Sequence, residues 1–73
     1  MERMDIYDKK EYFVRTSLKS LLFDVDKDIL DVYYKYQNDE EYVVIEFIKK
    51  GKIKICVTCD TLLGITKDVL KAL

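Results

Sequence analysis

The sequence predicts an α+β fold in which three strands lie between two helices. Between residues 29 and 58, three runs place apolar side chains at every second position, the spacing of a half-buried strand. A stretch on each side repeats its apolar side chains every three or four residues, as an amphipathic helix does. Because the strands share one strongly apolar face, we expect an antiparallel three-stranded meander with both helices packed on that face.

The first helix is predicted to begin at Asp8, because Asp8 and Glu11 have the spacing of a capping box. Tyr7 and Tyr12 then lie where a hydrophobic staple holds the entry to a helix. We expect residues 1–7 to be a flexible N-terminus of one domain that spans residues 1–73. The side chains expected to face the core are Val14, Leu18, Leu21, Leu22 and Val25.

The two hairpins are predicted from the rule that inward residues pair with inward residues. A two-residue turn at Asn38-Asp39 aligns Tyr34 with Val43, Val32 with Ile45, and Leu30 with Phe47. For the second hairpin, a three-residue loop at Lys49-Lys50-Gly51 aligns Phe47 with Ile53, Ile45 with Ile55, and Val43 with Val57. That loop also puts Gly51 where a positive φ is needed, which glycine adopts without steric cost.

The second helix is predicted to be capped by Asp60. Its expected inward side chains are Leu62, Ile65, Thr66, Val69, Leu70 and Leu73. Gly64 interrupts this helix and lowers its propensity. Two interpretations remain open, a tolerated glycine or a close approach of the helix backbone to the sheet.

Composition limits the classes of protein to which the chain can belong. Its 73 residues allow one small core, and the 49% hydrophobic and 37% charged shares are those of a soluble globular chain. No apolar run reaches the roughly 20 residues of a membrane span, and the N-terminus does not resemble a signal peptide, so we expect a cytoplasmic protein. The formal net charge of −1 means that any binding to nucleic acid depends on a local basic patch.

The sheet face opposite the helices is the first candidate binding surface. In the predicted register it carries an apolar cluster, and such a patch on a small protein often marks a contact site. Its members are Ile29, Tyr33, Tyr42, Val44, Ile48 and Cys56. We therefore expect an accessory protein that self-associates, as in a homodimer, or contacts a protein partner through this face. The alternative is that single apolar residues on an open sheet have no role.

A lysine-rich hairpin is the second candidate surface, for nucleic acid. It holds Lys49, Lys50, Lys52 and Lys54. The predicted topology is shared with double-stranded RNA-binding domains, which grip phosphates with lysines at the start of their second helix. Here that position reads Asp60-Thr61-Leu62-Leu63, so no residues carry over. Lysines at a hairpin tip also keep sheet edges from pairing, which needs no ligand.

The remaining motifs do not predict catalysis or a metal site. Cys56 and Cys59 have the C-x-x-C spacing of a redox pair or of half a zinc site shared with a second copy, but they also suit small, partly buried apolar positions. The acidic run from Asp24 to Asp28 begins like an EF-hand loop and departs from it at Ile29 and Lys35. With no histidine and no nucleophile–base pair, we expect a non-enzyme without cofactor or small-molecule substrate.

The closing stretch resembles a group of short proteins. Residues 53–63, reading IKICVTCDTLL, and residues 67–70, reading KDVL, are similar to the C-terminal ends of short uncharacterised proteins from phages and conjugative elements of low-GC Gram-positive bacteria. The resemblance implies an accessory protein of a mobile element. It implies no activity and no site residues.

Overall fold

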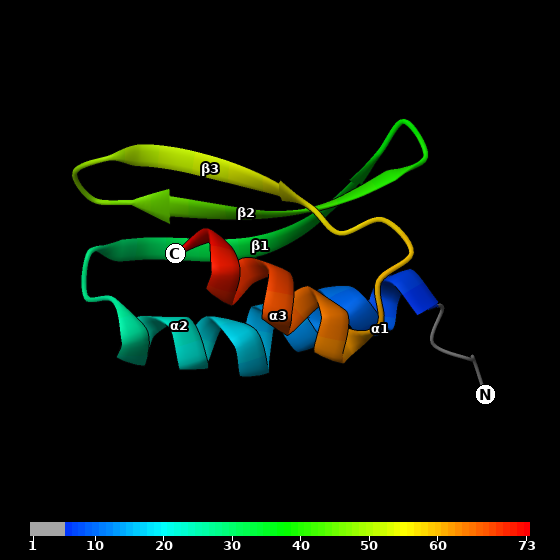
Figure 1. The fold of residues 1–73 in the computed structure, drawn as a ribbon, viewed down its shortest axis with the longest axis horizontal. Coiled ribbons are helices and arrows are strands. Elements are labelled where there is room, and N and C mark those ends of the chain that lie inside the picture. Colours follow the sequence, from blue (N-terminus) through cyan, green and yellow to red (C-terminus); the bar gives the residue numbers. More distant parts are fainter. Residues whose placement is uncertain (1–5) are drawn as a thin grey trace.

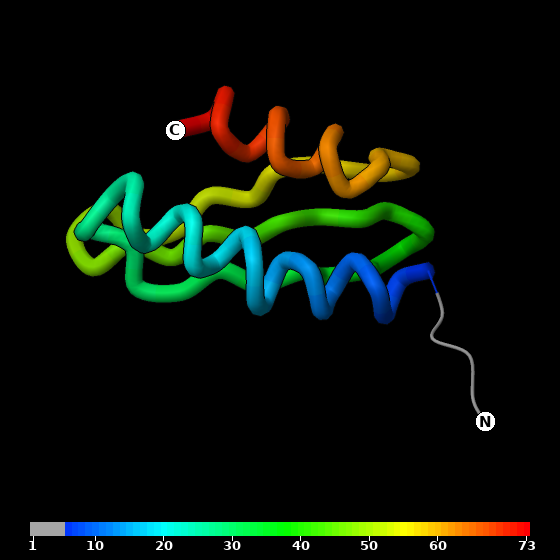
Figure 2. Tube along the Cα trace, turned by 90° about the horizontal axis from the view of Figure 1, so that it is seen from below, coloured from blue at the N-terminus to red at the C-terminus, as the bar shows by residue number. Residues whose placement is uncertain are grey.

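The computed structural model describes residues 6–73, which form two layers, a sheet and a pair of helices. In chain order the elements are α1 (Ile6–Phe13), the π-helical segment η1 (Val14–Leu18), α2 (Lys19–Val25), β1 (Ile29–Gln37), β2 (Glu40–Phe47), β3 (Gly51–Cys56) and α3 (Leu62–Ala72). The strands pair antiparallel in the order β1-β2-β3. Both the α1–η1–α2 helix and α3 lie on one side of the sheet (Figures 1 and 2). The predicted α-β-β-β-α fold is confirmed.

The core lies between these two layers, and its buried side chains come from η1, α2, β1, β2, α3 and the residue that follows β3. Its members are Val14, Leu18, Leu22, Ile29, Val32, Tyr34, Val43, Ile45, Phe47, Val57, Ile65 and Val69. Phe13, Phe23, Ile53 and Ile55 pack against it and are partly buried. The inward strand positions Val43, Ile45 and Val32 are therefore core residues, as the alternation predicts.

The first helix differs from the prediction in its start and in its buried stripe. Asp8 lies inside α1 rather than at its cap, and Ile6 and Tyr7 are helical, while residues 1–5 of the predicted flexible segment lie outside the described residues. The buried positions are Lys10, Val14, Leu18 and Leu22, at strict four-residue intervals. An ordinary α-helix drifts off one face at that spacing, and the wider turn of η1 removes the drift. Leu21 and Val25, which were expected inside, are exposed for this reason.

The first hairpin has the predicted turn but contains a bulge near its other end. Asn38 and Asp39 both have positive φ, and Tyr34 pairs with Val43 and Val32 with Ile45. Between Ile29 and Asp31, however, β1 contains one residue more than β2, so that Ile29 rather than Leu30 pairs with Phe47. A bulge of this kind reverses the facing of the residues before it. Ile29 is consequently 6% exposed and Leu30 is 58% exposed, the opposite of the prediction.

The second hairpin keeps the predicted facing but is shifted by two residues. Gly51 has φ 85°, as expected, yet it pairs with Phe47 as the first residue of β3, so the turn consists of Ile48, Lys49 and Lys50. Ile45 then pairs with Ile53 and Val43 with Ile55. A slip of two residues leaves every side chain on the same face, so alternation by itself does not distinguish the two registers.

The start of α3 is also corrected. Thr61 is the N-cap, and its hydroxyl accepts a hydrogen bond from the Gly64 N–H at 3.1 Å. A Cβ on Gly64 would lie 3.3 Å from Cγ of Asp60, so this glycine makes room for the loop before its own helix and not for the sheet. Of the predicted inward residues, Ile65 and Val69 are buried and Thr66 is half-buried. Leu62, Leu70 and Leu73 are exposed.

Candidate functional site

The side of the sheet away from the helices, here called the open sheet face, is only partly the surface that the sequence predicts. Of the expected contact residues, Ile29 is in the core, on the other side. Ile48 is 62% exposed in the turn before β3 and is not part of a strand. Tyr33, Tyr42 and Cys56 do alternate onto the open sheet face together with Val44. Val44 is only 4% exposed, so the predicted bare apolar platform is absent from this face.

Lysine and tyrosine side chains occupy the open sheet face instead. Because of the two-residue shift, Lys54 pairs with Val44 and Lys52 with Glu46, whereas the predicted register put Lys54 opposite Glu46. The Nζ atom of Lys54 lies 4.3 Å from the centroid of the Tyr42 ring, a cation–π contact. Tyr33, which pairs with Val44 from the other side, donates its hydroxyl to Oε2 of Glu46 at 3.3 Å. These long side chains cover Val44.

A hollow lies on this face. Its volume is about 300 Å³, and it is lined by Tyr33, Lys35, Val44, Lys52, Ile53 and Lys54. Lys35 stands on β1, opposite Tyr42, and Lys52 and Lys54 stand on β3. The hollow therefore lies between lysines of both edge strands.

The lysine-rich hairpin of the sequence is divided by the structure. Lys49 and Lys50 are exposed in the turn, where the Nζ atom of Lys50 lies 4.8 Å from the centroid of the Phe47 ring. Lys52 and Lys54 instead alternate onto the open sheet face with the tyrosines. Two of the lysines predicted to bind nucleic acid thus lie on the same surface as the tyrosines predicted to contact a protein partner.

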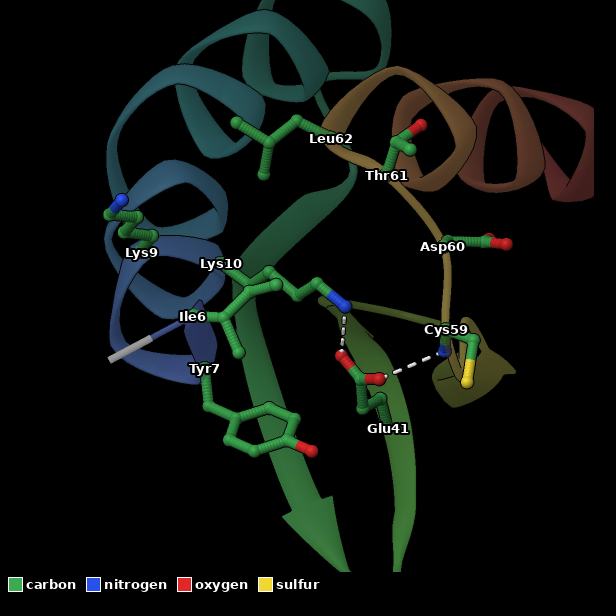
Figure 3. Close-up of a pocket in the computed structure, with 9 residues that line it drawn as sticks. All are labelled: Ile6, Tyr7, Lys9, Lys10, Glu41, Cys59, Asp60, Thr61 and Leu62. Atoms are coloured by element: carbon green, nitrogen blue, oxygen red, sulfur yellow. Dashed lines mark hydrogen bonds and ion pairs between the residues drawn. The ribbon is translucent and has the colours of Figure 1, made fainter. Parts of the chain in front are cut away.

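A cleft between the start of α1 and the loop before α3 was not predicted. Its volume is about 360 Å³, and it is lined by Ile6, Tyr7, Lys9, Lys10, Glu41, Cys59, Asp60, Thr61 and Leu62. Figure 3 shows the Lys10 side chain reaching from α1 to Glu41, with Tyr7, Ile6 and Leu62 around them and Asp60 pointing away. The Lys10–Glu41 ion pair therefore lies within the lining of this cleft.

Glu41 is hydrogen-bonded through both carboxylate oxygens, although it is only 3% exposed. Oε1 accepts from Nζ of Lys10 at 2.6 Å and from the Tyr34 hydroxyl at 2.8 Å, and Oε2 accepts from the Cys59 N–H at 2.9 Å. Burial by itself works to raise the pKa of Glu41, but these three donors outweigh burial and lower that pKa. Glu41 thus stays ionised and joins α1, both strands of the first hairpin and the loop before α3.

Neither partner of this buried pair was identified from the sequence, yet a signal was present. Glu41 occupies the inward phase of β2, with Val43 and Ile45, and Lys10 continues the stripe of Val14. One charge of each sign on two faces that pack together indicates a buried ion pair, because a lone buried charge is very costly. The cleft is therefore built around a structural contact, and its donors are already occupied.

The two cysteines are free and exposed. Sγ of Cys56 lies 3.3 Å from the Thr58 hydroxyl and 3.4 Å from Oε2 of Glu40. Cys59 has a positive φ of 64°, and the bond from its N–H to Glu41 holds it in the loop. Their expected role as partly buried apolar residues is wrong, because both are exposed. The redox and shared-zinc interpretations of the C-x-x-C spacing stay alternatives, which the sequence does not favour.

Asp60 contrasts with Glu41 in its hydrogen bonding. Its Oδ2 is buried and has no hydrogen-bond partner among residues 6–73. The neighbouring Asp68 carboxyl raises the pKa of Asp60, and burial adds to the rise. While both carboxylates are ionised, neither can donate to the other, so a proton on Asp60 supplies the missing donor.

Two further features are absent from residues 6–73, a metal-binding cluster and a membrane-spanning helix. Between residues 6 and 73, no three cysteine, aspartate or glutamate side chains gather closely enough to hold a metal ion. None of the helices in the same range has the length and apolar character of a membrane span. The absence of an enzymatic activity stays a prediction.

Comparison with known proteins identifies no relative, so a proposed function depends on the fold and on these surfaces. No family model matches the chain, and neither the curated proteins nor the solved structures include a significant match. The resemblance to proteins of mobile elements remains a prediction.

Proposed function

We propose that the protein is a non-enzymatic accessory protein whose open sheet face binds an anionic macromolecule. One observation carries this proposal: Lys35, Lys52 and Lys54 surround the tyrosines on the side of the sheet that has no helix. Lys52 and Lys54 are exposed, and so is Lys35. The same face also carries Asp31, Glu40 and Glu46, so its charge as a whole is balanced. The hollow, however, is lined by the three lysines and by no acidic residue, and this local positive charge attracts an anionic partner even though the whole chain carries a net charge of −1.

The small apolar area of this face favours a different partner over a second copy of the chain. A two-fold symmetric dimer buries the same patch of both copies, and stable dimer interfaces are largely apolar at their centre. With Val44 covered and Ile29 in the core, little apolar area is left for such an interface. Self-association through this face, which the sequence predicts as one option, is therefore the weaker candidate.

Elution from a heparin column tests the proposal. We expect Lys35→Gln, Lys52→Gln and Lys54→Gln combined to lower the salt concentration at which the protein elutes. The matched control replaces Lys27, Lys67 and Lys71, which are exposed elsewhere, by glutamine and should elute near the wild type. Equal shifts for the two triple variants would contradict the proposal. A dimer in analytical ultracentrifugation that Tyr33→Lys or Val44→Lys abolishes would favour self-association instead.

A further inference from the structure

We infer that the anionic partner is a single-stranded nucleic acid, whose bases stack on Tyr33 and Tyr42 while its phosphates contact the surrounding lysines. The inference rests on the proposed function and adds the chemical class of the ligand. Single-stranded nucleic acids are bound without strong sequence preference by aromatic side chains within a basic groove. The hollow on the open sheet face combines both features, because Tyr33 and three lysines line it and Tyr42 stands beside it.

The two tyrosines are placed for neighbouring bases. Tyr33 pairs with Val44 and Tyr42 pairs with Lys35, so the tyrosines are diagonal neighbours on adjacent strands. Diagonal neighbours are about 7–8 Å apart, and the side chains can lean toward each other. The bond from Tyr33 to Glu46 orients one ring. The Nζ atom of Lys54 lies over the other ring, so a base that stacks on that face of Tyr42 takes the place of this cation.

The charges around the rings define a short path for the backbone. Lys35 stands on β1, and Lys52 and Lys54 on β3, so cations flank β2 from both sides. A base on Tyr42 displaces Nζ of Lys54, which is then free to contact a phosphate. Glu46 beside Lys52 and Glu40 beside Cys56 place negative charge near the two ends of the path, and Asp31 is paired with Lys19 at 2.8 Å. The site therefore accommodates only a few nucleotides.

A duplex fits this surface poorly. Its bases are stacked on each other, so their faces are not available to Tyr33 and Tyr42, whereas an unpaired strand can splay them onto aromatic rings. Contacts between three lysines and phosphates give a slope of about −2 in the logarithm of affinity against the logarithm of salt, at about 0.7 per contact for single strands. Single-stranded ligands are thus expected to bind more tightly than duplexes at the same salt concentration.

Fluorescence anisotropy tests the inference with four labelled ligands. They are a mixed-sequence single strand of about 12 nucleotides, as DNA and as RNA, the matching DNA duplex, and poly-glutamate. The variants are Tyr33→Leu and Tyr42→Leu, with Tyr42→Phe retaining the ring and Tyr12→Leu altering an exposed tyrosine on α1. Thermal unfolding followed by circular dichroism verifies that each variant is folded.

We expect the single strands to bind best and each leucine variant on the open sheet face to weaken them by about 5- to 150-fold, the effect of losing one stacked base. Tyr42→Phe and Tyr12→Leu should bind like the wild type. Equal binding of all four ligands, unaffected by the leucine variants, would overturn the inference and leave the proposed function standing. No binding to any of them would overturn both.

Discussion

Glu41 and Asp60 are acidic residues near the same loop, yet they differ in hydrogen bonding and in the direction of their pKa shifts. Glu41 accepts three hydrogen bonds and its pKa is lowered, whereas Asp60 has a buried oxygen without a partner and its pKa is raised. The comparison shows that burial does not decide the effect of a carboxylate on stability. The donors that surround it do, because desolvation must be offset by hydrogen bonds to the charged form.

The substitution with the largest expected effect on stability removes Glu41. Glu41→Leu leaves the Lys10 ammonium, the Tyr34 hydroxyl and the Cys59 N–H without an acceptor, so we expect a loss of about 3–5 kcal/mol in the free energy of unfolding. Urea denaturation measures the loss, or shows that the cooperative transition has disappeared. Glu11→Gln, at an exposed site on α1, is the control. A similar stability for both variants would mean that the network around Glu41 does not hold the fold together.

Removing Lys10 should cost less, because Glu41 keeps two other donors. We expect Lys10→Met to lower the free energy of unfolding by about 1–3 kcal/mol. Urea denaturation of Lys10→Met, Glu41→Leu and the double variant completes a double-mutant cycle. The double variant should lose less than the sum of the two single losses, since neither buried charge is then left unpaired. Additive losses would contradict a direct interaction across the cleft.

Replacing Asp60 should have the reverse sign. Asp60→Asn removes one of two neighbouring negative charges and gives Asp68 an N–H donor. We therefore expect the free energy of unfolding to rise by about 0.5–1.5 kcal/mol at neutral pH. Chemical denaturation of Asp60→Asn beside Glu11→Gln measures this gain. A clear loss of stability in Asp60→Asn would show that the ionised carboxylate makes a favourable contact.

The pH dependence of stability should separate the two carboxylates, with the smallest effects. The raised pKa of Asp60 means that acid favours the folded state between that pKa and the ordinary value of 3.8. The lowered pKa of Glu41 means that stability is lost as the pH falls from its ordinary value of 4.5 through the folded value. Unfolding midpoints measured across this acid range test both effects. Asp60→Asn should no longer show the gain in stability on acidification, and Glu41→Gln should no longer show the loss. An unchanged profile in either variant would contradict the corresponding shift.

Two features of the strands show where prediction from alternation ends. Ile29 and Leu30 are both apolar, so alternation is compatible with either side chain facing the core. The bulge turns Ile29 toward the core. The second hairpin slipped by two residues, which alternation cannot detect. That slip bears on the proposed function, because it places Lys54 beside Tyr42 and opposite Val44. The residues of the candidate face were largely predicted, but its chemical character was not.

The sequence by itself determined the order of elements, the turn at Asn38-Asp39, the positive φ of Gly51 and the inward sets of the strands beyond the bulge. These follow from local spacing and from backbone sterics, which act within a few residues. Only the tertiary structure decided which apolar residue enters the core at Ile29, where Lys54 lies, and that Lys10 meets Glu41 from 31 residues away. Such contacts depend on how layers and strands align in space, and a periodic pattern is compatible with several alignments.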